Sequence, residues 1–151
     1  KCWPLANFHL LISELIVNGW PVVLVGGANE KETTQLKQEF HGEIHNTAGC
    51  FSPLESAELL KHARLVVTND TSVSHLAEAV NTPAIVLFGP TVREFGYVPF
   101  LEESELLETT EVLNCRPCSR DGRGKCVNRN YLQCLTSINP QNVMPLIPEL
   151  D

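Results

Sequence analysis

Three short apolar runs alternate with segments of helical periodicity, and this alternation constrains the fold more than any other feature of the chain. The runs are PVVLVGG at residues 21–27, LVVT at 65–68 and AIVLF at 84–88. Nearly continuous apolar runs are typical of parallel strands that are buried on both faces. Helical segments between such strands form right-handed crossovers that cover both faces of the sheet. The pattern therefore predicts an α/β fold with a doubly wound, Rossmann-like parallel sheet.

The expected helices lie between these strands. Apolar residues recur at helical spacing over residues 7–18, and a more polar helix fits residues 30–40. The tetrapeptide SPLE at 52–55 is a capping box with proline at the first helical position, so it predicts a helix that runs to about residue 63. The remaining expected elements are a short strand at 43–46, a helix at 72–80, one strand within 104–113, and a short terminal helix that begins at Asn139 and Pro140.

Composition favours a soluble globular domain and excludes several classes of protein. The chain has 151 residues, of which 43% are hydrophobic and 19% are charged. Its net charge of -7, without any stripe of lysine and arginine, argues against nucleic-acid binding by phosphate neutralisation. No apolar run approaches the roughly 20 residues of a membrane-spanning helix, and no signal peptide opens the chain. Because the chain begins at Lys1 rather than at methionine, we expect a piece of a longer protein.

The loop GGANE follows the first predicted strand and carries Gly26, Gly27 and Glu30. Open parallel sheets bind ligands at the carboxyl ends of their strands, where loops meet helix N-termini. Glycines permit a ligand to approach the backbone closely, and a carboxylate at this place accepts hydrogen bonds from ribose hydroxyls. Taken alone, however, the two glycines fit a plain turn better than a binding site.

The loop NDTS at 69–72 carries more polar groups than a helix cap requires. Aspartate, threonine and serine are favoured N-caps, but one of them is enough to cap a helix. The amides of Thr71 and Ser72 at the helix start suit a phosphate group. The carboxylate of Asp70 would repel a phosphate, so it fits the neutral hydroxyls of a sugar better. His75 falls in the first turn of the helix, where a structural role and a ligand-facing role are both open.

A third loop, FGPT at 88–91, ends the next predicted strand with ordinary loop chemistry. The three loops together predict a pocket for a nucleotide or a nucleotide-sugar. The chain contains neither G-x-x-x-x-G-K-[ST] nor G-x-G-x-x-G, which disfavours P-loop ATPases and the dehydrogenases that carry the dinucleotide fingerprint.

The segment NDTSVSHLAEAVNTPAIVLFGPT at 69–91 resembles the signature of glycosyltransferase family 9, the ADP-heptose:lipopolysaccharide heptosyltransferases. The opening KCWP resembles the family's K-x-W-P element, VVLVGGANE its strand-Gly-Gly-x-x-Glu element, and CRPCSRDGRGKC its C-terminal cysteine segment. The resemblance runs in the family's order from Lys1 to about Ile147. It implies the C-terminal, donor-binding half of a GT-B fold.

The resemblance also implies a domain organisation and an activity. Residues 1–113 would form the Rossmann-like donor-binding region, and residues 114–151 the cysteine-rich segment and C-terminal helix of the same domain. The N-terminal acceptor domain, with the family's acidic catalytic base, and the first strand of this half would be absent, so no catalytic residue is expected here. The implied reaction is inverting transfer of heptose from ADP-heptose to a lipopolysaccharide core acceptor, without a required cofactor.

The implied partners follow from that reaction. They are a nucleotide-sugar donor and a lipid-linked glycan acceptor that is reached through the missing domain, in a cytoplasmic bacterial enzyme peripheral to the inner membrane. Loss of a partner domain would expose an apolar cleft face, which predicts a homodimer through that face.

Several positions match donor-binding positions of the family. Lys1 would contact the donor diphosphate, and Glu30 would hold the ribose. Asp70 would hold sugar hydroxyls. The family commonly has glycine where this chain has Ser72, so the closest approach of backbone to phosphate departs from the family pattern. The complete set of implied donor-binding residues is Lys1, Gly26, Glu30, Asp70, Thr71, Ser72 and His75.

Four of the six cysteines cluster late in the chain with the spacing C-x2-C-x7-C-x7-C, namely Cys115, Cys118, Cys126 and Cys134. Four thiols are enough for a closed tetrahedral zinc site, although the second pair is spaced more widely than in common zinc folds. Reduced buried thiols and disulfides formed after purification are the alternatives. Because the family's chemistry needs no metal, we rank structural packing first, zinc second and nucleophilic catalysis last.

Other function classes stay open at this point. A non-catalytic zinc-binding or interaction module would bind zinc stoichiometrically and be indifferent to nucleotides. A glycosyltransferase with a different nucleotide-sugar would keep the fold and change the preferred base. A nucleotide-sugar epimerase or hydrolase would need its own acid/base pair, for which Asp70 and His75 are the adjacent candidates.

Overall fold

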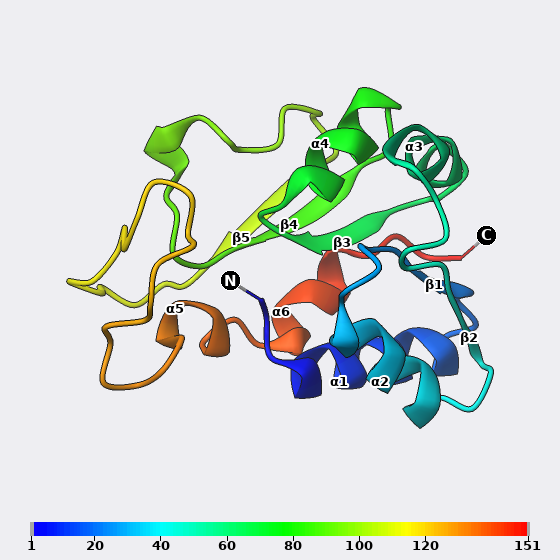
Figure 1. Cartoon of the computed structure of the whole chain (residues 1–151), viewed down its shortest axis with the longest axis horizontal. Helices are drawn as coiled ribbons and strands as arrows, with labels where there is room; N and C mark the ends of the chain where they lie inside the picture. The colour runs from blue at the N-terminus through cyan, green and yellow to red at the C-terminus, as the bar shows by residue number, and fades with distance from the viewer. Residues whose placement is uncertain (1, 151) are drawn as a thin grey trace.

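A computed structural model describes residues 2–150, and its strands form two parallel sheets (Figure 1). The smaller sheet pairs β1 (Val22–Leu24) with β2 (Ile44–Asn46). In the larger sheet, β4 (Ala84–Phe88) lies between β3 (Val66–Asn69) and β5 (Glu105–Glu108). All three strand pairs are parallel and are joined through helices or long connections. The predicted α/β fold with parallel pairing is confirmed.

The helices cover both faces of the larger sheet. Figure 1 shows α3 and α4 on one side of it, and α1 and α6 on the other, while α2 packs against β2 of the smaller sheet. The helix bounds are Leu5–Val17 for α1, Lys31–Glu39 for α2, Pro53–Lys61 for α3, Ser72–Ala79 for α4, Gln133–Thr136 for α5 and Pro140–Val143 for α6. A 3-10 helix, η1 (Arg93–Phe95), follows β4, and a second one, η2 (Met144–Leu146), follows α6. This two-sided covering is the doubly wound arrangement that the alternating pattern predicts.

Helix α3 begins where the capping box predicts. The Ser52 hydroxyl accepts a hydrogen bond from the Glu55 amide, and the Glu55 carboxylate accepts one from the Ser52 amide at 2.8 Å. Pro53 occupies the first helical position, where its missing N–H is not needed. The strand predicted at 21–27 is shorter than expected, because the chain leaves the β1–β2 ladder before Gly26.

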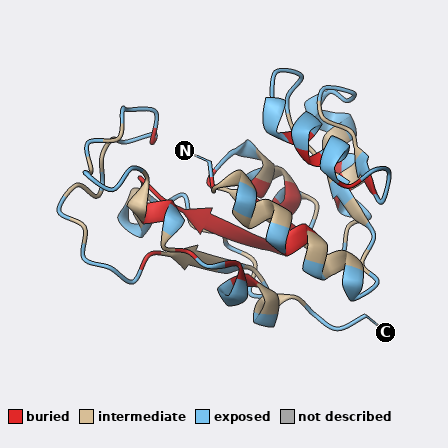
Figure 2. Ribbon diagram, turned by 90° about the horizontal axis from the view of Figure 1, so that it is seen from below, coloured by how far each residue is buried: buried red, intermediate tan, exposed pale blue. Residues whose placement is uncertain are grey.

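Strand β4 is the centre of the larger core. All five of its residues are buried, as Figure 2 shows for the strand that crosses the middle of the molecule. Ile85 and Leu87 pack with Trp3, Leu135 and their neighbours on one face. The alternate residues of β4 pack against the α3 and α4 side on the other face, together with Leu60, Val66 and Ala77. A strand buried on both faces explains why AIVLF contains no polar residue.

The smaller sheet has its own apolar cluster. Ile12, Leu36, Phe40 and Ile44 are buried together, with Val22 and other partly buried side chains around them. Leu11, the residue before Ile12 on α1, belongs instead to the cluster around β4. Helix α1 therefore joins the two cores. Within residues 2–150, no helix combines the length and the apolar character that crossing a membrane requires.

Candidate functional site

The loop after β1 folds the Glu30 carboxylate back over its own turn. Glu30 is the N-cap residue of α2, and its Oε1 atom accepts a hydrogen bond from the Gly27 amide at 3.1 Å. A Cβ at Gly26 would overlap this carboxylate where it now lies, so a larger residue there would displace the Glu30 side chain from the turn. The Glu30 side chain is exposed and remains accessible to a ligand.

The loop after β3 sends Asp70 inward rather than toward solvent. Asp70 is 5% exposed, and its Oδ2 atom accepts a hydrogen bond from the Thr91 hydroxyl at 2.6 Å. Thr91 is 1% exposed and ends the loop that follows β4. The pair therefore ties the carboxyl ends of two neighbouring strands together. A buried carboxylate needs such a donor, but the sequence does not reveal which residue supplies it.

Helix α4 presents its N-terminus to solvent at this edge. Thr71 is the N-cap residue, and its hydroxyl accepts a hydrogen bond from the Val73 amide at 3.3 Å. Ser72 is the first helical residue, and both Thr71 and Ser72 are exposed. His75 is also exposed, in the first turn. The predicted cap is confirmed, and an exposed helix N-terminus of this kind favours anions.

Residues near the chain start connect the two loops. The Trp3 amide donates a hydrogen bond to Asn69 Oδ1 at 2.8 Å, and Asn69 Nδ2 donates one to Cys2 Sγ at 3.7 Å. Desolvation by neighbouring atoms raises the pKa of the Cys2 thiol, although Cys2 as a residue is exposed, and the Glu32 and Glu30 carboxylates raise it further. Cys2 is therefore close to both the β1 loop and the β3 loop. Lys1, the expected diphosphate contact, lies outside the described residues.

Asn69 received no role in the sequence interpretation, although it holds the chain start beside the β3 loop. The available signal was its place in NDTS directly after a strand. An amide side chain there supplies both a donor and an acceptor, as its two bonds to residues 2 and 3 require.

Arg116 holds the turn after β4, and sequence reasoning missed it as well. Its Nε atom donates to the Gly89 carbonyl at 2.5 Å, and its Nη2 atom donates to the Thr91 carbonyl at 2.8 Å. Nη2 also lies 2.6 Å from Glu108 Oε2. Burial alone would raise the pKa of the Glu108 carboxyl, but hydrogen bonds from Arg93 and Arg116 lower it below its usual range. The guanidinium group of Arg116 thus links the turn after β4 to Glu108 of β5 by hydrogen bonds.

The four late cysteines lie in the segment that leads away from Arg116. Cys134 is buried, whereas Cys115, Cys118 and Cys126 are partly exposed. Burial raises the pKa of both Cys118 and Cys134, and the neighbouring thiols of the cluster add to this effect. All six cysteines are free thiols. Among residues 2–150, no three histidine, cysteine or acidic side chains are arranged as ligands around a metal position.

Comparisons with known proteins identify the family of this chain. The family model for glycosyltransferase family 9 (heptosyltransferase) matches residues 1–130. Lipooligosaccharide heptosyltransferase 2 of Haemophilus influenzae is 31% identical over 99% of this chain and 43% of its own length. Lipopolysaccharide heptosyltransferase 2 of Escherichia coli is 28% identical over 95% of this chain and 41% of its own length.

A solved structure, that of the E. coli ADP-heptose lps heptosyltransferase II, superposes with a TM-score of 0.76 at 25% identity. The superposition covers 95% of this chain and 40% of that one. The chain therefore spans about two fifths of the length of the relatives that it matches. The family model accounts for most of the sequence, and the structural match accounts for nearly all of the fold. The chain belongs to glycosyltransferase family 9, the heptosyltransferases.

Proposed function

We propose that this chain binds ADP-heptose at the carboxyl edge of its sheets and that the protein it belongs to transfers heptose, with inversion, to a lipopolysaccharide core acceptor. The observation that carries the proposal is the approach of two loops around Cys2. Asn69, the last residue of β3, donates a hydrogen bond to the Cys2 thiol, and the Glu30 and Glu32 carboxylates raise the pKa of that thiol. One loop therefore offers a carboxylate and the other a helix N-terminus. A nucleotide-sugar needs both, for its ribose and for its phosphates.

In this proposal each group has a distinct task. The exposed Glu30 carboxylate, beside Gly26, accepts hydrogen bonds from the ribose hydroxyls. The amides of Thr71 and Ser72 receive a phosphate at the positive end of α4. Lys1 would add a point charge for the diphosphate.

Asp70 and His75 complete the proposed pocket from the α4 side. Asp70 takes sugar hydroxyls while its Oδ2 atom keeps the bond to Thr91. His75 is exposed one turn into α4, near the phosphate end. The structural relative is named for ADP-heptose, which supports adenine over other bases for this donor pocket.

The division of labour along the whole protein is part of the same proposal. The chain matches about two fifths of each relative, so we assign the acceptor site and the catalytic base to the remaining length. Residues 1–113 would bind the donor, with residues 114–151 as the cysteine segment and terminal helix of the same domain. This chain alone would then bind the donor without transferring sugar, and no cofactor would be required. The whole enzyme would work at the cytoplasmic face of the inner membrane.

A homodimer through the apolar face toward the rest of the enzyme is a further expectation. Static light scattering over a wide concentration range tests it, and a strictly monomeric chain at high concentration would contradict it.

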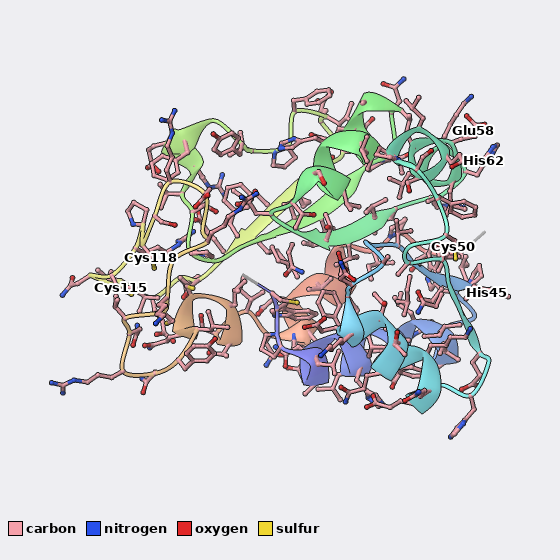
Figure 3. All side chains as sticks on the ribbon, viewed as in Figure 1. His45, Cys50, Glu58, His62, Cys115 and Cys118 are labelled. Carbon is pink, nitrogen blue, oxygen red and sulfur yellow. The ribbon has the colours of Figure 1, made fainter. Side chains whose placement is uncertain are left out.

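Amide NMR titrations with ADP, UDP and GDP test the donor assignment. We expect ADP to shift the resonances of residues 26–30 and 69–75 more than UDP or GDP does. The variant Glu30→Gln should weaken ADP binding about tenfold, because it removes the charge from a hydrogen-bond acceptor worth about 1.4 kcal/mol. The matched control is Glu58→Gln on α3, an exposed carboxylate far from this edge (Figure 3).

Two results would count against the proposal. Equal responses to ADP, UDP and GDP would contradict the proposed preference for adenine, although the assignment of the fold would stand. Equal weakening by Glu30→Gln and Glu58→Gln would remove Glu30 from the site.

A further inference from the structure

The cysteine segment lacks the usual sources of order. Residues 109–132, between β5 and α5, contain no helix or strand. Segments of this length without regular structure are uncommon inside compact domains. Val112, Val127 and Tyr131 are largely exposed, so its apolar side chains build no core of their own. Short segments without a core are commonly held by a disulfide or a metal ion.

Three cysteines of this segment and Cys134 of α5 surround one cavity. Cys115, Cys118, Cys126 and Cys134 all line a space of about 430 Å³, together with Gly122, Gly124 and several polar residues. Cys134 reaches the cavity from α5, where it is buried. Thiols that are 19 residues apart in sequence therefore converge on the same space.

Hydrogen-bond donors and one positive charge lie beside the sulfur atoms of the cavity. The Leu132 amide donates a hydrogen bond to Cys126 Sγ at 3.2 Å, and Asn128 Nδ2 donates one to Cys115 Sγ at 3.5 Å. Hydrogen bonds of this kind also orient and support cysteine ligands in metal sites. Lys125 also lines the cavity and supplies positive charge. Four thiolates around one divalent ion carry a net charge of about -2, which these donors and this lysine partly offset.

We propose that Cys115, Cys118, Cys126 and Cys134 bind one Zn²⁺ in a closed tetrahedral site that orders the cysteine segment. In residues 2–150 the sulfurs are not yet gathered as ligands, so binding must draw them inward to Zn–S distances of about 2.3 Å. The cavity leaves room for this movement, and its two glycines place few side-chain atoms in the way. With four protein ligands the metal has no open position, so its role is structural.

The site would also fix the turn beside the proposed donor pocket. The Cys118 amide donates a hydrogen bond to the Pro90 carbonyl at 3.1 Å. Its neighbour Arg116 holds the carbonyls of Gly89 and Thr91. A metal that fixes Cys115 and Cys118 therefore also fixes residues 116–118, which donate the hydrogen bonds to residues 89–91. The inference goes beyond the proposed function, and nucleotides take no part in its test.

Metal analysis of the reduced chain, after one equivalent of Zn²⁺ is added and the excess is removed, tests the site directly. We expect about one Zn²⁺ per chain. In the zinc-bound chain, a thiol reagent should modify Cys2 and Cys50 and leave the four cluster thiols protected until a chelator is added. Cys118→Ser and Cys126→Ser should each lose zinc binding. Cys50→Ser is the matched control, because Cys50 is exposed and lies far from Cys115 and Cys118 (Figure 3).

A spectrum of the unaltered chain keeps the test independent of how the variants fold. Bound Co²⁺ in place of Zn²⁺ should give thiolate-to-cobalt charge-transfer bands and intense ligand-field bands of a tetrahedral centre. Absence of these bands, with all six thiols reactive in the presence of zinc, would overturn the proposal. An intact mass that shows disulfides among the four cysteines after purification under reducing conditions would overturn it too. Equal zinc retention by Cys118→Ser and by the control would show adventitious binding only.

Discussion

Replacement of Thr91 by valine is the sharpest test of how the two strand ends are held together. Valine has nearly the same shape as threonine but places a methyl group where the hydroxyl stands. In the native chain that hydroxyl donates to Asp70 Oδ2 at 2.6 Å, and the two residues are 1% and 5% exposed. Water therefore has little access to replace the lost donor. The substitution leaves a carboxylate oxygen facing a methyl group inside the fold.

The expected loss follows from the kind of bond that is removed. A hydrogen bond to a charged group contributes about 1.5–3 kcal/mol net, so we expect the free energy of unfolding to fall by about 2 kcal/mol. With a urea m-value of about 2 kcal/mol/M for a chain of this size, the unfolding midpoint should fall by about 1 M. Thr91→Ser keeps the hydroxyl and removes only a methyl group, so it should cost about 1 kcal/mol.

Urea unfolding at neutral pH, followed by circular dichroism and by tryptophan fluorescence, measures all three chains. Trp3 is 1% exposed and packs in the cluster that includes β4, so its emission reports on this core. Coincident transitions from the two probes would support two-state analysis. The reasoning is refuted if Thr91→Val is as stable as the native chain, or more stable than Thr91→Ser.

Three further substitutions test other contacts. Glu108→Gln should destabilise the chain by about 1–3 kcal/mol at pH 7, because it removes the charge that Arg116 binds. Since the pKa of Glu108 is lowered by folding, its contribution is present above the unfolded value of about 4.3 and is lost as the pH falls through the folded value. The difference between mutant and native urea midpoints should therefore shrink below about pH 4, and a constant difference would contradict this account. Gly89→Ala should cost about 1–3 kcal/mol by thermal unfolding, because its Cβ would overlap the buried side chain of Leu135; an unchanged midpoint would show that Leu135 moves freely. Ser52→Ala should cost about 0.5–2 kcal/mol through loss of the α3 cap, and Ser52→Thr should restore most of it.

Elements with local signals could be predicted from the sequence. The SPLE box places the start of α3 because both of its hydrogen bonds join residues three apart. The run AIVLF predicts β4 because burial on both faces excludes polar residues. Thr71 is recognisable as a cap for the same local reason. The family and the parallel α/β fold followed from such elements and were confirmed.

Contacts between distant segments left no comparable signal. The bond from Thr91 to Asp70 spans 21 residues, and the bond from Arg116 to Gly89 spans 27. The Trp3 indole donates to the Ile138 carbonyl across 135 residues. Neither periodicity nor turn chemistry encodes which partner a buried polar group finds. The sequence analysis also missed the division of the strands into two sheets. An apolar run predicts a strand, but it does not show which other strand will pair with it. The donor-binding roles of individual residues stay predictions.

The division into two sheets with separate apolar clusters has a consequence for cooperativity. Structural units that share few buried contacts open at different free energies, and amide hydrogen exchange resolves them. The small unit of α2, β1 and β2 is tied to the β4 core mainly through α1, where Leu11 and Ile12 enter different clusters. Its amides should exchange through partial opening while β4 stays protected. A ligand that contacts both Glu30 and the start of α4 would hold the small unit against the β4 core. The amides of the small unit would then exchange only after the ligand dissociates.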